Sequence, residues 1–156
     1  MFFAMFFAMF FAVFWATILY SQAGNESLVK FEEGYRGPHW QFIKEYVESQ
    51  EIAYGFFIEG ETEWSDILVA FHDVNDDGQL ELFFRIYDGP FCGTAECTTF
   101  VFQMQGGVWK NIAEFNSTAI IVSDEKILGY RTLYWLKSRT HWDGEQYVPV
   151  DLDPEG

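Results

Sequence analysis

The segment 73–81 holds the most specific chemistry in this chain of 156 residues. It reads Asp-Val-Asn-Asp-Asp-Gly-Gln-Leu-Glu, so side-chain oxygens recur on alternate residues before Gly78, where the backbone must turn sharply. Calcium takes about six to eight oxygens at ~2.3–2.6 Å, and this spacing matches the first nine positions of the EF-hand calcium loop. Asp76 adds negative charge but does not point the same way. The sequence therefore predicts calcium ligands at five positions: Asp73, Asn75, Asp77, Gln79 (through its main-chain carbonyl) and Glu81.

The surroundings of this segment favour a loop between strands rather than a helical EF-hand. The twelfth position, where an EF-hand places a bidentate Glu, is Phe84. The flanking runs 67–71 and 80–87 are apolar and strand-like. Without the twelfth-position carboxylate, we expect a weak site, with a dissociation constant on the order of 0.1–1 mM. The alternative is an Asx-rich turn that satisfies its own backbone and binds no ion.

Groupings typical of catalysis are much weaker. The three histidines, His39, His72 and His141, are scattered and lack the spacing of a metalloprotease. No serine lies in a G-x-S-x-G turn. A carbohydrate-active enzyme with a pair of carboxylates stays open as the least favoured alternative, because no such pair stands out. We therefore expect a binding protein and name no catalytic residue.

Cys92 and Cys97 enclose only Gly-Thr-Ala-Glu. In an exported chain, two cysteines this close are typical of a disulfide. A metal site would need two further soft ligands, and a C-x-x-C redox motif has a tighter loop. Closing so small a loop stabilises the fold by roughly 2 kcal/mol on the chain-entropy model.

The first twenty residues carry no charge and repeat the unit Met-Phe-Phe-Ala. Ser21-Gln22-Ala23 then offers small residues at the positions that a signal peptidase reads. We expect residues 1–23 to be a signal peptide. No Lys or Arg precedes the apolar stretch, which at about 20 residues is also long enough to span a bilayer, so an uncleaved anchor or a misassigned start are the alternatives.

The remaining chain, 24–150 as a single β-rich domain and 151–156 as an acidic tail, carries the whole formal net charge of −15. Such a charge repels phosphate groups and anionic lipids, which excludes nucleic acid and leaves the membrane only to an uncleaved N-terminal segment. Cations, basic proteins or an envelope polysaccharide are better partners. An inhibitor or immunity protein that binds a basic enzyme or toxin is the alternative function. Its candidate acids are Glu59, Glu61, Glu63, Asp124 and Glu125.

Hydrophobic patterning predicts an α+β fold, mostly antiparallel β, with one N-terminal helix followed by about seven strands. Residues 25–37 are polar and without period, so we expect a lead-in there. The helix begins near Pro38 and places Trp40, Ile43, Tyr46 and Val47 on one face. The segment 54–58 is a possible first strand. The expected strands then cover 67–71, 80–87, 98–104, 108–115, 118–122, 130–137 and 146–150, with turns at 106–107, 123–126 and 143–144.

Three motifs occur in one order: D-V-N-D-D-G-Q-L-E between strands, then F-C-G-T-A-E-C, then W-D-G-E-Q-Y near the end. Over roughly residues 42–150, this combination resembles a group of small exported bacterial proteins with a strand–DxNxDG–strand element, a C-G-x-x-x-C loop and a terminal W-x-G hairpin. The acidic segment alone is similar to the calcium loops of FG-GAP and VCBS repeats. It occurs once, so a propeller built of such repeats is excluded. The resemblance implies a periplasmic or secreted location and the disulfide, and it implies no activity.

Overall fold

The computed structural model describes residues 26–54, 64–87, 91–94, 96–135 and 138–150. Within these residues the chain forms ten strands, one α-helix and one 3-10 turn: β1 (Ser27–Leu28), β2 (Glu32–Glu33), α2 (Trp40–Tyr54), η1 (Trp64–Asp66), β3 (Ile67–His72), β4 (Glu81–Ile86), β5 (Cys97–Gln105), β6 (Val108–Ser117), β7 (Ile121–Ile127), β8 (Tyr130–Trp135), β9 (Ser138–Trp142) and β10 (Tyr147–Val150). The expected α+β fold, mostly antiparallel β with one helix, is confirmed at that level.

The strands form two antiparallel five-stranded sheets. Sheet A has the order β1-β7-β8-β9-β10, and sheet B has the order β2-β3-β4-β5-β6. Apart from β1 and β2, strands that pair in a sheet also follow one another in the chain. The turn at Gly106-Gly107 between β5 and β6 is the predicted two-residue hairpin, in which both glycines have a positive φ.

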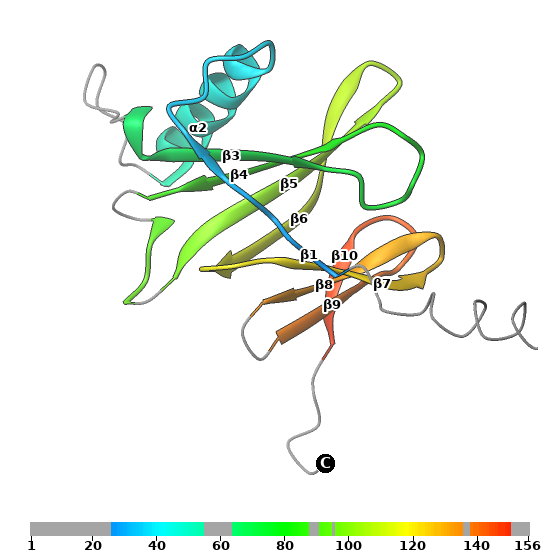
Figure 1. Cartoon of the computed structure of the whole chain (residues 1–156). Coiled ribbons are helices and arrows are strands. Elements are labelled where there is room, and N and C mark those ends of the chain that lie inside the picture. The colour runs from blue at the N-terminus through cyan, green and yellow to red at the C-terminus, as the bar shows by residue number, and fades with distance from the viewer. Residues whose placement is uncertain (1–25, 55–63, 88–90, 95, 136–137, 151–156) are drawn as a thin grey trace, which may run out of the picture.

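Sheet B is the middle of three layers, with α2 on one face and sheet A on the other (Figure 1). Ile43 and Val47 of α2 pack with Leu82 and Phe84 of β4 in one apolar cluster. Phe83 of β4 belongs to the second cluster, which sheet A closes. Because β4 is covered on both faces, all six of its residues are buried, and its sequence lacks the polar alternation of a half-exposed strand.

The predicted helix and its buried face are confirmed. Ile43 and Val47 are fully buried, and Tyr46 lies edge-on against Phe100 and Phe102 of β5. Burial of one such aliphatic side chain is worth about 1.5–3 kcal/mol, so this face is enough to fix α2 on sheet B.

Several boundary predictions were wrong. The polar lead-in contains β1 and β2, so the helix follows two strands instead of opening the fold. The predicted strand 130–137 is β8, and a further strand, β9, follows it, so the described residues form ten strands instead of about seven. The strands β1 and β2 have two residues each, which is too short to show a period. Residues 123–126 belong to β7 instead of separating two strands. The β7–β8 register shifts between Val122 and Lys126, and this irregularity accommodates the polar residues.

Cys92 and Cys97 form the expected disulfide, and a β-bridge joins the same two residues. The predicted signal peptide 1–23, the acidic tail 151–156 and the segment 55–58 lie outside the described residues. In the part of the chain that the structure describes, no helix is long and apolar enough to cross a lipid bilayer.

Candidate functional site

The acidic segment is the loop between β3 and β4, which pair antiparallel along their full length, from Ile67 opposite Ile86 to His72 opposite Glu81. The loop therefore leaves and re-enters the middle of sheet B as a hairpin. Gly78 has φ +82°, a conformation that favours glycine. Asp76 has φ +60°, which Asp tolerates better than most residues.

Asp73 organises the loop through main-chain hydrogen bonds. Its Oδ1 accepts hydrogen bonds from the amides of Asn75, at 3.2 Å, and Asp76, at 2.6 Å. Its Oδ2 accepts one from the amide of Gly78 at 2.9 Å. Three amide hydrogens thus converge on one carboxylate and curl the backbone around it. These bonds span two to five residues, which is why the spacing in the sequence already indicated a turn.

Asn75 and Asp77 continue the pattern. Asn75 Oδ1 accepts a hydrogen bond from the Asp77 amide at 3.0 Å, and Asp77 Oδ1 accepts one from the Gln79 amide at 2.7 Å. The Asn75 side-chain amide donates to Asp77 Oδ2 at 2.9 Å. A carbonyl or carboxylate oxygen has two lone pairs. One oxygen of Asp73, one of Asn75 and both of Asp77 each accept a single hydrogen bond among the described residues, so each keeps a lone pair for another partner. Oxygen donors of this kind suit a hard cation such as calcium.

Glu81 has a different environment from the other predicted ligands. It is 1% exposed and lies under the loop, where Oε2 accepts a hydrogen bond from the Val74 amide at 2.8 Å and Oε1 accepts one from Gln103 Nε2 at 3.2 Å. Burial raises the pKa of Glu81 to about 7, against the lowering effect of these two hydrogen bonds. The charges of Asp77 and Asp73 raise its pKa further.

The carboxylates do not already surround a single point. Among the described residues, no three His, Cys, Asp or Glu side chains are grouped so that they could hold a metal ion. The hydrogen bonds give the reason, since Asp73 and Asp77 bind loop amides while Glu81 faces the protein interior. Gln79 is exposed and donates its amide to Asp77.

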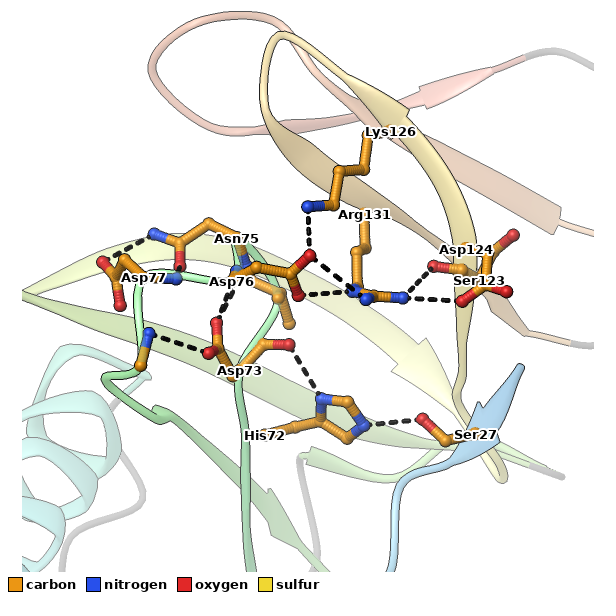
Figure 2. Close-up of polar contacts among 12 residues, drawn as sticks. Ser27, His72, Asp73, Asn75, Asp76, Asp77, Ser123, Asp124, Lys126 and Arg131 are labelled. Carbon is orange, nitrogen blue, oxygen red and sulfur yellow. Dashed lines mark hydrogen bonds and ion pairs between the residues drawn. The ribbon is translucent and has the colours of Figure 1, made fainter. Parts of the chain in front are cut away.

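Asp76 points away from the other loop acids and joins the loop to sheet A (Figure 2). Its carboxylate accepts a hydrogen bond from Arg131 Nε at 2.9 Å and forms a second ion pair with Lys126. These two hydrogen-bonded cations lower the pKa of Asp76 to about 2. The Arg131 amide donates to the Val74 carbonyl at 2.7 Å, so main-chain and side-chain contacts act together. The loop of sheet B is therefore fastened to β7 and β8 of sheet A.

His72 provides a second connection between the sheets (Figure 2). Its Nδ1 lies 3.1 Å from the Asp73 carbonyl, and its Nε2 lies 2.7 Å from Ser27 Oγ in β1. Because a carbonyl can only accept, the neutral ring carries its proton on Nδ1 and Ser27 donates to Nε2. A cavity lined partly by Asp66 lies at the other end of β3. At ~3.3 Å per residue that is about 20 Å away, so we assign the Ser27–His72 pair a structural role.

The acids proposed for a basic partner are partly engaged within the protein. Asp124 binds Arg131 at 2.8 Å, and Glu125 binds Arg139 and accepts a hydrogen bond from the Tyr134 hydroxyl. The segment with Glu59, Glu61 and Glu63 lies outside the described residues.

The other two histidines do not join the loop. His39 packs against Trp109 and Phe71 beside the helix, and His141 lies in β9 opposite Val148.

The contacts that sequence reasoning missed all join distant segments. Arg131 and Lys126 lie 55 and 50 residues from Asp76, Ser27 lies 45 residues from His72, and Gln103 lies 22 residues from Glu81. No local pattern marks such pairs.

The chain matches no protein-family model, and no curated protein and no solved structure is detectably similar to it.

Proposed function

We propose that this protein is an exported binding module whose two-sheet framework is stabilised by calcium in the loop 73–81. The observation that supports the proposal is the position of the loop. It presents side-chain oxygens with unused lone pairs, and it is fastened to sheet A through Asp76 and through the Val74 carbonyl. An ion that orders this loop would therefore also stabilise the contact between the sheets.

The ligands would come from Asp73, Asn75 and Asp77, with the Gln79 carbonyl and Glu81 completing the set. Calcium would supply positive charge where three loop carboxylates and the buried Glu81 lie close together in sequence. Glu81 already accepts two protein hydrogen bonds, so it would contribute mainly through its charge. We expect a dissociation constant on the order of 0.1–1 mM, as in weak extracellular sites. The ion is a structural clamp in this proposal, and we assign it no reaction.

Thermal unfolding tests the calcium proposal. At a calcium concentration tenfold above the dissociation constant, mass action stabilises the folded state by roughly 1.4 kcal/mol. In a domain of this size the melting midpoint should rise by about 3–6 °C. Magnesium should raise it less, because it prefers a tight octahedron and retains its waters.

Two loop variants and one control make this test specific. Asp77→Asn keeps an oxygen that can accept the Gln79 amide but removes one charge, so the fold should persist with a much smaller calcium response. Asp73→Ala should abolish the response. Glu114→Ala removes an exposed carboxylate from β6 and should respond like the wild type. If the wild-type midpoint is the same in chelator and in several millimolar calcium, the loop is an Asx-rich turn and the calcium proposal fails.

Export is part of the same proposal. The Cys92–Cys97 disulfide supports an oxidising compartment, since disulfides persist mainly in exported proteins. If Ser21-Gln22-Ala23 is the cleavage site, the intact mass of the exported protein should correspond to a chain that begins at Gly24. A membrane-bound species that still carries residues 1–20 would instead identify an anchor.

A second candidate function, which a specific observation favours, is the binding of a basic partner protein. The chain has a formal net charge of −15, and two of its acids line an open cavity. An inhibitor or immunity protein would use such a surface to engage a basic enzyme or toxin.

A further inference from the structure

A cavity of about 500 Å³ lies on sheet B, at the opposite end of the β3–β4 hairpin from the acidic loop. Its described lining residues are Glu33, Asp66, Leu68 and Tyr87. The volume falls within the range of small-ligand sites, about 300–1,000 Å³.

Strand pairing explains why these four side chains share one place. Glu33 of β2 is paired with Leu68 of β3, and Leu68 is paired with Arg85 of β4. Directly paired residues of antiparallel strands point to the same face of the sheet. Asp66 precedes Leu68 by two residues and Tyr87 follows Arg85 by two, and the Tyr87 amide donates to the Asp66 carbonyl at 2.8 Å. The cavity is thus built on the framework of sheet B.

The chemistry of the lining is selective. Two carboxylates, one aliphatic side chain and one tyrosine suit a cation carried on an apolar stem. Leu68 can contact the stem, and the Glu33 carboxylate can accept hydrogen bonds from an ammonium or guanidinium group, while Asp66 adds negative charge to the lining. The Arg85 guanidinium lies 5.8 Å from the centroid of the Tyr87 ring, and because Tyr87 is 45% exposed, the exposed part of the ring can pack against a ligand.

Arg85, which is paired with Leu68, binds hydroxyl and carbonyl groups of its own sheet. Its side chain is 2% exposed and donates to Thr99 Oγ1 at 2.9 Å, Ser117 Oγ at 2.8 Å and the Thr118 carbonyl at 2.7 Å. Within the described ranges, no carboxylate lies within ion-pair distance of Arg85. The guanidinium is too deeply buried to receive an anion, and it helps to hold the tyrosine, whose hydroxyl lies 3.5 Å from its Nη1.

We propose that this cavity receives an arginine or lysine side chain of a basic partner protein. A protein partner is favoured over a free small cation because the whole domain is acidic. Its field would attract a basic surface and speed the encounter before one side chain enters the cavity. This inference deepens the second candidate function and rests on it, and it is independent of calcium.

The test is a titration of the exported protein, in chelator, followed by two-dimensional amide NMR. The probes are the capped peptide Gly-Arg-Gly and its neutral counterpart with citrulline in place of arginine. The arginine peptide should cause saturable shifts centred on Glu33, Asp66, Leu68 and Tyr87, and the citrulline peptide should bind at least fivefold more weakly. Equal binding of the two peptides, or shifts centred elsewhere, would overturn the proposal.

Variants separate this cavity from the general acidity of the domain. Glu33→Gln should weaken binding about threefold, as expected for loss of one exposed ion pair. Glu114→Gln removes the same charge outside the cavity and should leave binding unchanged. Tyr87→Leu should weaken binding about twofold to fivefold, whereas Tyr87→Phe keeps the ring and should bind like the wild type. An equal loss in Glu33→Gln and Glu114→Gln would show non-specific attraction and refute the site.

Two further titrations test whether the bound cation belongs to a protein side chain and whether binding at the cavity is independent of calcium. Spermidine, a free polyamine, should bind more weakly than the arginine peptide at matched salt concentration, and tighter binding would overturn the assignment to a protein side chain. Asp77→Asn should bind the arginine peptide as the wild type does. The calcium proposal is judged by melting curves and this one by peptide titration, so either can fail without the other.

Discussion

Glu81 allows a quantitative prediction about pH and stability in the calcium-free protein. Its carboxyl is 1% exposed, and burial raises its pKa from 4.5 to about 7. Between these two pH values the folded state binds more protons than the unfolded state, so stability decreases as pH rises. The stabilisation from the protonated carboxyl is fully present below pH 4.5 and is lost as pH rises through about 7. One pKa unit corresponds to ~1.36 kcal/mol, so the total loss is about 3 kcal/mol.

The substitution Glu81→Gln isolates this contribution. The amide keeps the size of the side chain and an acceptor for the Val74 amide, but it cannot ionise. A constant offset in stability between the two proteins is expected, because the new amide also faces Gln103. The informative quantity is how the difference in unfolding free energy changes with pH. Relative to wild type, the variant should gain about 3 kcal/mol between about pH 4.5 and pH 8.

Urea denaturation in chelator, followed by tryptophan fluorescence, measures this difference. The tryptophans of the domain, Trp109 and Trp142 among them, provide the signal. Midpoints and slopes are compared at each pH, so that a change in stability is separated from a change in the exposed surface. Parallel stability curves for the two proteins across this pH range would refute the reasoning. Glu81 would then ionise in the folded state as easily as in the unfolded chain.

Three further substitutions have defined outcomes. Asp76→Asn should lower the melting midpoint at about pH 5, because the ionised carboxylate is paired with two cations that lower its pKa. Protonation of Asp76 removes this stabilisation, so the difference in midpoint between variant and wild type should shrink as pH falls from 3.8 toward about 2. Gly78→Ala should lower the free energy of unfolding in urea by about 1–2 kcal/mol, because the φ of +82° is strained for alanine even though a Cβ would meet no atom there. Gly93→Ala is the control and should change the free energy of unfolding by less than about 0.5 kcal/mol. Replacing Cys92 and Cys97 together by serine should destabilise by about 2 kcal/mol, and an unchanged urea midpoint would show that the disulfide contributes no stability.

Much of the fold was predictable because its determinants are local. The helical period of Ile43 and Val47 identified both α2 and its buried face. Gly106-Gly107 fixed a hairpin, and the apolar runs around the acidic loop became β3 and β4. The strands β1 and β2 were missed, since two residues carry no period and form a strand only when a partner strand is present.

In the candidate site, too, local contacts could be predicted from the sequence and long-range contacts could not. The turn around Asp73 could be read from the sequence, because its hydrogen bonds reach only two to five residues along the chain. The burial of Glu81 could not, because β4 becomes internal only after α2 and sheet A cover both faces of sheet B. The ion pair between Asp76 and Arg131 could not be read from the sequence either, because these residues lie 55 positions apart in the chain.

The sequence by itself determined the acidic loop, the disulfide partners, the helix and most of the strands, because each depends on residues close together in the chain. Only the tertiary structure decided that the loop connects two sheets, that one predicted ligand is buried with a raised pKa, and that Glu33, Asp66 and Tyr87 meet at a cavity. These features depend on which faces of the sheets pack together. Side-chain burial and long-range charge pairing exist only after that packing has formed.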